Sequence, residues 1–345
     1  MAEFWDRDRT YAFFRPYVDL CTRLSYRRME VVGEPPRGYD GAVIIAPNHT
    51  NTLMDALVVL RSFPKGIVFG ARADIFRKPA IARIMHMLKI VPLARSNRDR
   101  PEEVARNPQT FIEIDRVLEH GLPFCIFSEG RHRPMHSLLP IRRGVATLAF
   151  RSAEQRPTVV VPVGIDYSDW FRHRGLVRVK YGDPIDVNAL LPSVQGLSVS
   201  ARDNVLQDEL RDRLSKLIFY LPDDEHYEER LAEAEAEKPV RHRVRRVVQA
   251  VLSFPLFLVC ALLSLPMWAL AEWICSRMKD PAFQNTARFG VRMLGTPVFF
   301  VIWAVVFFLL LPWWAALCGL GLFLISYSVF YDWLGLVRPL GEPLW

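Results

Sequence analysis

The sequence predicts an α/β protein in which helices flank a mixed sheet, with transmembrane or re-entrant helices in its C-terminal part. From Gly41 to about residue 220, short β-rich runs alternate with helical patterns, and charged residues are abundant. From residue 247 to residue 333 the chain is mostly apolar. We therefore expect an α/β domain over residues 1–222, a charged linker over 223–246 and membrane helices over 247–333.

The first thirty residues mix aromatic side chains with arginines, which predicts an amphipathic helix. Such a helix either covers the core or lies on a lipid surface. The expected strands lie at residues 42–47, 66–70, 123–128, 158–163 and 176–181. The expected helices lie near residues 53–62, 79–88, 110–120, 144–153 and 203–219. The highly charged residues 223–238 are most simply a solvated helix or linker.

Basic residues flank the first apolar block, residues 247–275. A basic run at 241–246 precedes it, and four basic side chains follow it, namely Arg277, Lys279, Arg288 and Arg292. Positive charge beside an apolar run marks the cytoplasmic side of a membrane. Because about 20 apolar residues cross a bilayer, the block is long enough to span, although two prolines interrupt it.

The second apolar block, residues 297–333, is broken at Pro312, and each half is short for a full span. Two hairpins that enter and leave on the cytoplasmic side would satisfy the charge pattern, and one or three plain spans are the alternatives. A buried soluble helical core is disfavoured because residues 298–311 carry no charge.

The composition limits the cellular compartments and the classes of partner that are compatible with the sequence. A formal charge of +7 together with apolar segments points to anionic membrane surfaces or phosphorylated substrates, and no nucleic-acid module accompanies the charge. The five cysteines are scattered and lack a C-x-x-C spacing, which argues against a disulfide framework or a zinc site. The N-terminal residues lack the order of a signal peptide. We expect a membrane-bound protein whose α/β domain is cytoplasmic, on a bacterial inner membrane.

His49 and Asp55 lie six positions apart, directly after the apolar run 42–46. An imidazole can take a proton from an alcohol, and a carboxylate can hold the imidazole tautomer and stabilise the imidazolium. This is the logic of a Ser-His-Asp triad without its serine, so an external alcohol would be the nucleophile. Taken alone, the pair is also compatible with an ordinary surface contact.

Further segments carry residue types that suit a phosphorylated alcohol. The apolar run 88–94 is closed by Arg95, and a guanidinium can hold a phosphate at two points, although many strands end in arginine. Glu129 and Gly130 directly follow the expected strand at 123–128. Glycine lets backbone approach a ligand closely. Glu129 either holds a hydroxyl of the acceptor or forms a structural ion pair.

In this order the motifs resemble the glycerolipid acyltransferase superfamily, whose pattern is an Asn-His box with a downstream Asp, a strand ending in Arg, a Phe-Pro-Glu-Gly box and a Val-Pro-Val box. The last box matches residues 161–163, and the resemblance covers roughly residues 40–190. It implies transfer of a fatty acyl group from a thioester donor, acyl-CoA or acyl-carrier protein, to a glycerophosphate hydroxyl, with no cofactor and no metal. It implies that His49 is the base and Asp55 its partner. Acyl phosphate also presents an activated carbonyl and is the alternative donor.

The resemblance also implies a set of substrate-binding residues. These are Asn48, Arg95, Ser128, Glu129, Gly130, Arg131 and Arg143. The arginines among them would anchor the acceptor phosphate. Backbone N–H groups near Gly130 or in the His49 loop are the candidates for stabilising the oxyanion. The partners are therefore expected to be membrane lipids, the acyl donor and the glycerophosphate acceptor.

Two features depart from the commonest pattern of the superfamily. Five residues separate His49 from Asp55 where four are usual, and Ser128 stands where proline is usual. The longer spacing resembles the branch of glycerol-3-phosphate and dihydroxyacetone-phosphate acyltransferases typified by fungal enzymes, and residues 138–144 and 161–167 agree with that branch. Glycerol-3-phosphate is therefore the expected acceptor. Acylation of lysophosphatidic acid, or lysophospholipid remodelling, is the alternative.

Two hypotheses from other classes are weaker. A non-catalytic membrane lipid-binding protein would be expected to have a degenerate site, yet His49, Asp55, Arg95 and Glu129 are all present. A serine hydrolase would need a Gly-x-Ser-x-Gly elbow, which no serine in this sequence has.

Overall fold

The computed structural model describes residues 3–6, 8–36, 38–63, 66–95, 98–236, 243–337 and 344–345. Its strands are β1 (Arg28–Val32), β2 (Ala42–Pro47), β3 (Val68–Arg72), β4 (Ile90–Leu93), β5 (Phe124–Cys125), β6 (Thr158–Tyr167), β7 (Leu176–Tyr181) and β8 (Ile185–Asp186). The helices of the same part are α1 (Arg9–Ser25), α2 (Thr52–Ser62), η1 (Ala73–Arg77), α3 (Pro79–Met87), α4 (Pro101–Val104), α5 (Asn107–Glu119), α6 (Arg143–Ala153), α7 (Val187–Val194), α8 (Val199–Leu217) and α9 (Tyr227–Ala236).

The strands form one mixed sheet in the order β1-β7-β6-β2-β5-β3-β4, with β8 paired to β6. Strands β2, β5, β3 and β4 are parallel to their neighbours, and β7 and β8 run antiparallel to β6. This confirms the predicted mixed sheet. Because carboxyl ends of parallel strands meet at one edge, the segments that follow β2, β3, β4 and β5 gather there. Those segments carry most of the candidate site residues.

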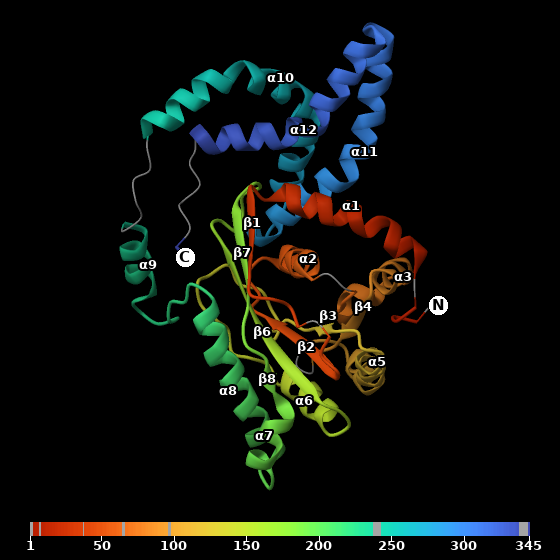
Figure 1. Ribbon diagram of the computed structural model, residues 1–345, viewed down its shortest axis with the longest axis vertical. Coiled ribbons are helices and arrows are strands. Elements are labelled where there is room, and N and C mark those ends of the chain that lie inside the picture. The colour runs from red at the N-terminus through yellow and green to blue at the C-terminus, as the bar shows by residue number, and fades with distance from the viewer. Residues whose placement is uncertain are drawn as a thin grey trace.

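Helices cover both faces of the sheet (Figure 1). Along β2, Ile44 belongs to the core cluster beneath α5, α6 and α8, whereas Ile45 belongs to the cluster beneath α1 and α2. This alternation follows from the two-residue period of a strand. Helix α1 both packs on the core through Cys21 and exposes Phe13, which is 77% accessible. The two predictions for the N-terminal helix are therefore compatible with each other.

The five predicted strands are confirmed: β2 and β7 have the predicted bounds, and the bounds of the other three differ. The ladder of β5 stops at Cys125, whereas β6 continues to Tyr167. β1, β4 and β8 were not among the predicted strands. β1 is a half-exposed edge strand, β8 is only two residues long, and β4 was described only as part of the apolar run that Arg95 closes. The predicted charged linker contains α9, and Tyr227 at the start of α9 is buried. Residues 237–242, with the start of the basic run, lie outside the described residues.

The C-terminal part consists of α10 (Arg243–Cys275), η2 (Pro281–Phe283), α11 (Gln284–Leu310) and α12 (Trp313–Val337). By length and composition, three helices here could cross a membrane, which indicates membrane association. The predicted break at Pro312 is confirmed, and Figure 1 shows α11 and the start of α12 projecting as a hairpin. The first apolar block is a single helix through Pro255 and Pro266, and not the hairpin that the sequence suggested.

Polar contacts join the base of these helices to the α/β domain. Arg288 pairs with Glu272 through both of its oxygens and donates to the Phe171 carbonyl at 2.7 Å. Arg174, in the same connection between β6 and β7, pairs with Asp332 of α12 at 2.6 Å. Arg288, one of the basic residues that flank the apolar blocks, is thus bound within the protein, and these contacts dock the helices on the domain.

Candidate active site

His49 and Asp55 are brought together at the carboxyl end of β2. The Nδ1 atom of His49 lies 2.8 Å from the Oδ2 atom of Asp55, whose side chain is fully buried. The same oxygen accepts the backbone N–H groups of Thr50 and Asn51, each at 2.7 Å. The longer spacing therefore gives a loop that wraps around the carboxylate. Because the Nδ1–H group of His49 donates to Asp55, the other ring nitrogen, Nε2, points away from α2.

The exposed side of the imidazole is next to aromatic rings. His49 stacks on Phe127, with ring centroids 4.3 Å apart, and lies edge-on to His132 at 5.7 Å. Its side chain keeps 16% of its surface accessible. Within the part of the chain that the structure describes, Nε2 has no hydrogen-bond partner. This nitrogen is therefore free to approach a substrate hydroxyl.

The other oxygen of Asp55 binds a residue that the sequence reasoning did not single out. Tyr167, at the end of β6, donates its hydroxyl to Oδ1 of Asp55 at 2.7 Å. Burial, the largest cause, and the charge of Asp55 raise the pKa of the Tyr167 hydroxyl, so it stays a donor. The tyrosine stands in the segment 161–167 that the motif comparison had matched, but its partner is 112 positions away. A local pattern could not reveal that contact.

Asn48 is bound within the protein. Its amide donates to the Ile165 carbonyl at 3.1 Å and accepts the Ile165 N–H at 2.7 Å. It is 1% exposed. Both polar ends of the side chain thus extend the pairing of β2 with β6, and a bond to substrate would require breaking one of them.

Glu129 is buried, with 2% of its surface exposed, and supports the His49 loop. Its Oε1 atom accepts the backbone N–H of His49 at 2.7 Å, and its Oε2 atom accepts the N–H of Leu139 at 2.8 Å. Burial raises the pKa of this carboxyl to about 7, against the opposing effect of the two N–H donors. Among the described residues it forms no ion pair with an arginine, which was one of its two predicted roles.

The turn after β5 requires glycine. Gly130 has a φ of +69°, and a Cβ placed there would lie 3.2 Å from Cγ of Arg142. Ser128 before it is 1% exposed, and its hydroxyl has no hydrogen-bond partner among the described residues. Arg131, directly after the turn, is exposed to solvent.

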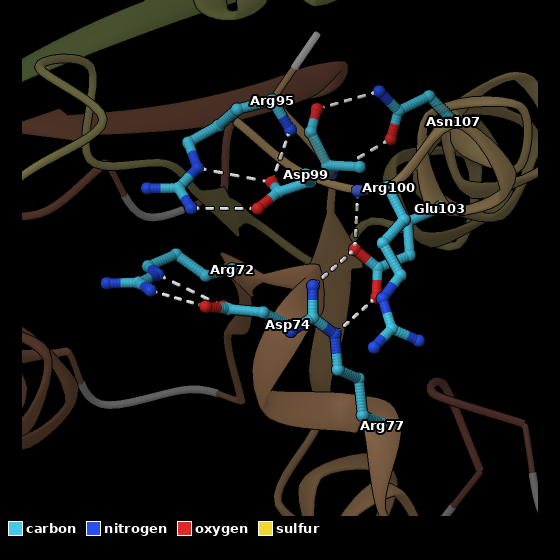
Figure 2. Close-up of polar contacts among 9 residues, drawn as sticks. Arg72, Asp74, Arg77, Arg95, Asp99, Arg100, Glu103 and Asn107 are labelled. Carbon is cyan, nitrogen blue, oxygen red and sulfur yellow. Dashed lines mark hydrogen bonds and ion pairs between the residues drawn. The ribbon is translucent and has the colours of Figure 1, made fainter. Parts of the chain in front are cut away.

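Two arginines lie on neighbouring strand ends (Figure 2). Arg95 follows β4 and forms a two-point pair with Asp99, at 2.8 and 3.1 Å. Arg72 ends β3 and pairs with Asp74 in the same way. Figure 2 shows both guanidinium groups pointing to the same side. Arg72 was missed, although Gly70-Ala71-Arg72 also closes an apolar run with arginine.

The remaining predicted residues are less closely associated with the pair. Arg143 is exposed and donates to the Ser200 hydroxyl at 2.7 Å, toward the start of α8. Arg133, which was not predicted, donates its backbone N–H to the His49 carbonyl at 3.1 Å. The structure thus brings Asn48, Asp55 and Glu129 into direct contact with the His49 loop and directs Arg143 elsewhere.

Four of the backbone N–H groups expected to stabilise an oxyanion are already bonded within the protein. That of His49 donates to Glu129, those of Thr50 and Asn51 donate to Asp55, and that of Gly130 donates to Phe127 at 3.0 Å. In this arrangement they do not serve as oxyanion donors.

Comparison with known proteins shows which family the α/β domain is similar to. The family described as Acyltransferase matches residues 26–166. Glycerol-3-phosphate O-acyltransferase 1 of Saccharomyces cerevisiae is 33% identical over 102 residues, which are 29% of this chain and 13% of the relative. Glycerol-3-phosphate O-acyltransferase 2 of the same yeast is 35% identical over 85 residues, which are 24% of this chain and 11% of the relative. The matches therefore span only about an eighth of these relatives.

Among solved structures, the 1-acyl-sn-glycerophosphate (LPA) acyltransferase PlsC from Thermotoga maritima aligns with a TM-score of 0.42 at 18% identity, over 61% of this chain and 84% of that chain. Residues 26–166 contain His49, Asp55 and the turn at Gly130, and Tyr167 follows directly after them. These similarities support the glycerolipid acyltransferase superfamily for residues 26–166, with relatives among the glycerol-3-phosphate O-acyltransferases.

Proposed function

We propose that this protein transfers a fatty acyl group from a thioester donor to a hydroxyl of glycerol-3-phosphate at a membrane surface. The observation that carries the proposal is the 2.8 Å contact between Nδ1 of His49 and the buried carboxylate of Asp55. It makes His49 a base with a fixed tautomer and a free Nε2. No serine is needed when the acceptor itself brings the hydroxyl.

In the proposed reaction, Nε2 of His49 takes the proton of the acceptor hydroxyl as that oxygen attacks the thioester carbonyl carbon. Asp55, held by backbone N–H groups and Tyr167, stabilises the imidazolium. The tetrahedral intermediate then collapses, the C–S bond breaks, and the imidazolium returns the proton to the leaving thiolate. Acyl-CoA and acyl-carrier protein both supply such a thioester.

Arg72 and Arg95 are the proposed anchor for the acceptor phosphate. Neighbouring strands are about 4.8 Å apart, so β3 and β4 lie roughly 10 and 14 Å from β2 across the sheet. Each arginine donates from one edge of its guanidinium group to its own aspartate. The N–H groups on the outer edge remain available for a phosphate. Arg131, exposed after the turn at Gly130, is a third cation near the same edge.

Glycerol-3-phosphate is favoured over lysophosphatidic acid by the five residues between His49 and Asp55 and by the names of the two yeast relatives. The basic residues around the apolar blocks support a cytoplasmic position of the α/β domain, on a bacterial inner membrane.

Activity of the purified full-length protein tests the proposal. Acyl-CoA and acyl-carrier protein are each supplied with glycerol-3-phosphate or with lysophosphatidic acid, and products are identified by mass spectrometry. We expect lysophosphatidic acid to form from glycerol-3-phosphate. The variant His49→Ala should lose about 10³-fold in rate, because general base catalysis typically contributes 10²–10⁴-fold. It should still fold, with a lowered melting temperature, because Asp55 loses one of its hydrogen bonds.

His120→Ala is the matched control, since His120 is exposed and stacks on Trp5 away from the pair. Activity of His49→Ala close to that of the wild type would contradict the proposed base. Product formed only from lysophosphatidic acid would assign the alternative acceptor.

A further inference from the structure

Residues 276–286, which join α10 to α11 and include the first residues of α11, form what we call the α10–α11 turn. This turn contacts α2, the helix that carries Asp55. Oγ1 of Thr286, in the first turn of α11, lies 2.9 Å from Oγ1 of Thr52. The Thr52 hydroxyl also donates to the carbonyl of Ala282 in η2, at 3.4 Å. Thr52 is the first residue of α2 and has a φ of +46°, a strained conformation for threonine. Ala282, between α10 and α11, and Thr286, in the first turn of α11, thus bind the residue at which α2 begins.

A second contact from the same turn leads to His49. Nε2 of His132 lies 3.2 Å from Oδ2 of Asp280. The His132 ring lies edge-on to His49 at 5.7 Å and edge-on to Phe283 at 5.4 Å. His132 is therefore held between the base and the turn.

Asp280 is oriented for this contact. Its Oδ1 atom accepts the Ala282 N–H at 2.9 Å, which leaves Oδ2 for His132. The Ala282 N–H, and to a smaller extent His132, hold the pKa of the Asp280 carboxyl below its usual value. An ionised carboxylate is a stronger acceptor than a neutral group, so the contact fixes the direction of the His132 ring.

We propose that the α10–α11 turn is a working part of the active site, in which Asp280 acts through His132, and Thr286 through Thr52, to position His49 and Asp55. The inference rests on the proposed function. The turn lies outside residues 26–166, which match the family. A misplacement of about 1 Å can cost a reaction about 10²-fold, so contacts that only orient the base affect the rate. The membrane helices then complete the site as well as holding it near lipid.

The Asp280–His132 contact is tested by a double-mutant cycle in the full-length protein. Asp280→Asn keeps an oxygen for the Ala282 N–H and removes the charge that faces His132. We expect kcat to fall about tenfold, with KM for donor and acceptor and the melting temperature unchanged. In a His132→Ala background the same change should have no further effect, because the partner is already gone. Lys279→Gln, an exposed neighbour in the turn, is the control and should keep wild-type kcat.

The Thr286–Thr52 contact is tested by Thr286→Val and Thr286→Ser. Valine removes the hydroxyl at nearly constant volume, and serine keeps it. We expect the valine variant to lose several-fold in kcat and the serine variant to retain the wild-type value.

Three results would overturn the inference: wild-type kcat in Asp280→Asn, an undiminished effect of Asp280→Asn in the His132→Ala background, or equal kcat in both Thr286 variants. Absence of acyl transfer by the wild type would instead refute the proposed function. An active wild type with unaffected turn variants would refute only the role of the turn.

Discussion

At the scale of single residues, the proposed site depends most on Asp55. Its fully buried carboxylate accepts four hydrogen bonds, from the His49 imidazole, two backbone N–H groups and the Tyr167 hydroxyl. A buried ionised carboxylate is unfavourable unless bonds of this kind satisfy its oxygens. The same bonds leave it one orientation, which is why His49 is held in one tautomer.

Replacing Tyr167 by phenylalanine removes one of these four bonds and little else. A hydrogen bond to a charged group contributes about 1.5–3 kcal/mol, so we expect a stability loss of roughly 2 kcal/mol and a fall in kcat of about tenfold, with KM unchanged. Steady-state kinetics and thermal unfolding measure the two effects.

Tyr181→Phe is the matched control for that variant. The Tyr181 hydroxyl bonds Ser62 at 2.7 Å, away from the His–Asp pair. This control should lose stability and keep kcat. If both variants had the same kcat, Tyr167 would not position Asp55.

At the scale of elements, Glu129 joins segments that lie far apart in the chain. It follows β5, and its two oxygens bind the loop after β2, at His49, and the segment before α6, at Leu139. The loop that carries the base is thus held from two sides, by Asp55 within its own segment and by Glu129 from the neighbouring strand. This role explains why the buried carboxylate of Glu129 accepts hydrogen bonds from backbone N–H groups and is not paired with an arginine among the described residues.

The raised pKa of Glu129 predicts a dependence of stability on pH. Burial raises this pKa from 4.5 to about 7, so the folded protein binds the proton more tightly than the unfolded chain. The stabilisation is fully present below about pH 4.5 and is lost as pH rises through about 7. The shift corresponds to roughly 3 kcal/mol at most.

Glu129→Gln cannot ionise, so its stability should change less than that of the wild type between pH 5 and pH 8. Melting temperatures at both values, in the same detergent, measure the difference. Asp166, whose pKa burial raises to about 6, is common to both proteins and cancels in the comparison. An equal pH dependence in the two proteins would contradict the assignment.

At the scale of the whole molecule, local patterns predicted much of the fold and part of the candidate site. The mixed sheet, the break at Pro312 and the pairing of His49 with Asp55 all follow from spacing along a few residues. What the sequence did not reveal depends on distant contacts. Tyr167 meets Asp55 across 112 positions, and His132 meets Asp280 across 148. No periodicity encodes such contacts, because they arise only when strands and helices pack.

The apolar surface of the C-terminal helices makes a prediction about the whole molecule. Leu309, near the end of α11, is 78% exposed, and residues 293–331 contain no charged side chain. A lysine at a solvated position usually changes stability little, whereas a lysine inside a bilayer is unfavourable, by up to about 2.5–3.5 kcal/mol at the centre of a spanning helix. Leu309→Lys should therefore reduce the amount of protein in the membrane fraction. Leu197→Lys, at a 46% exposed position of the α/β domain, should leave that amount unchanged.

Fractionation of membranes followed by quantitative blotting measures both variants against the wild type. High salt, which screens surface charge, should release none of the three proteins, and detergent should release the wild type, because its attachment is apolar. If Leu309→Lys behaved like Leu197→Lys, the end of α11 would lie in water, and the hairpin of α11 and α12 would not be inserted in lipid. Since the α10–α11 turn contacts both Thr52 and His132, a loss of insertion should also lower acyl transfer per molecule, which the same preparations can show.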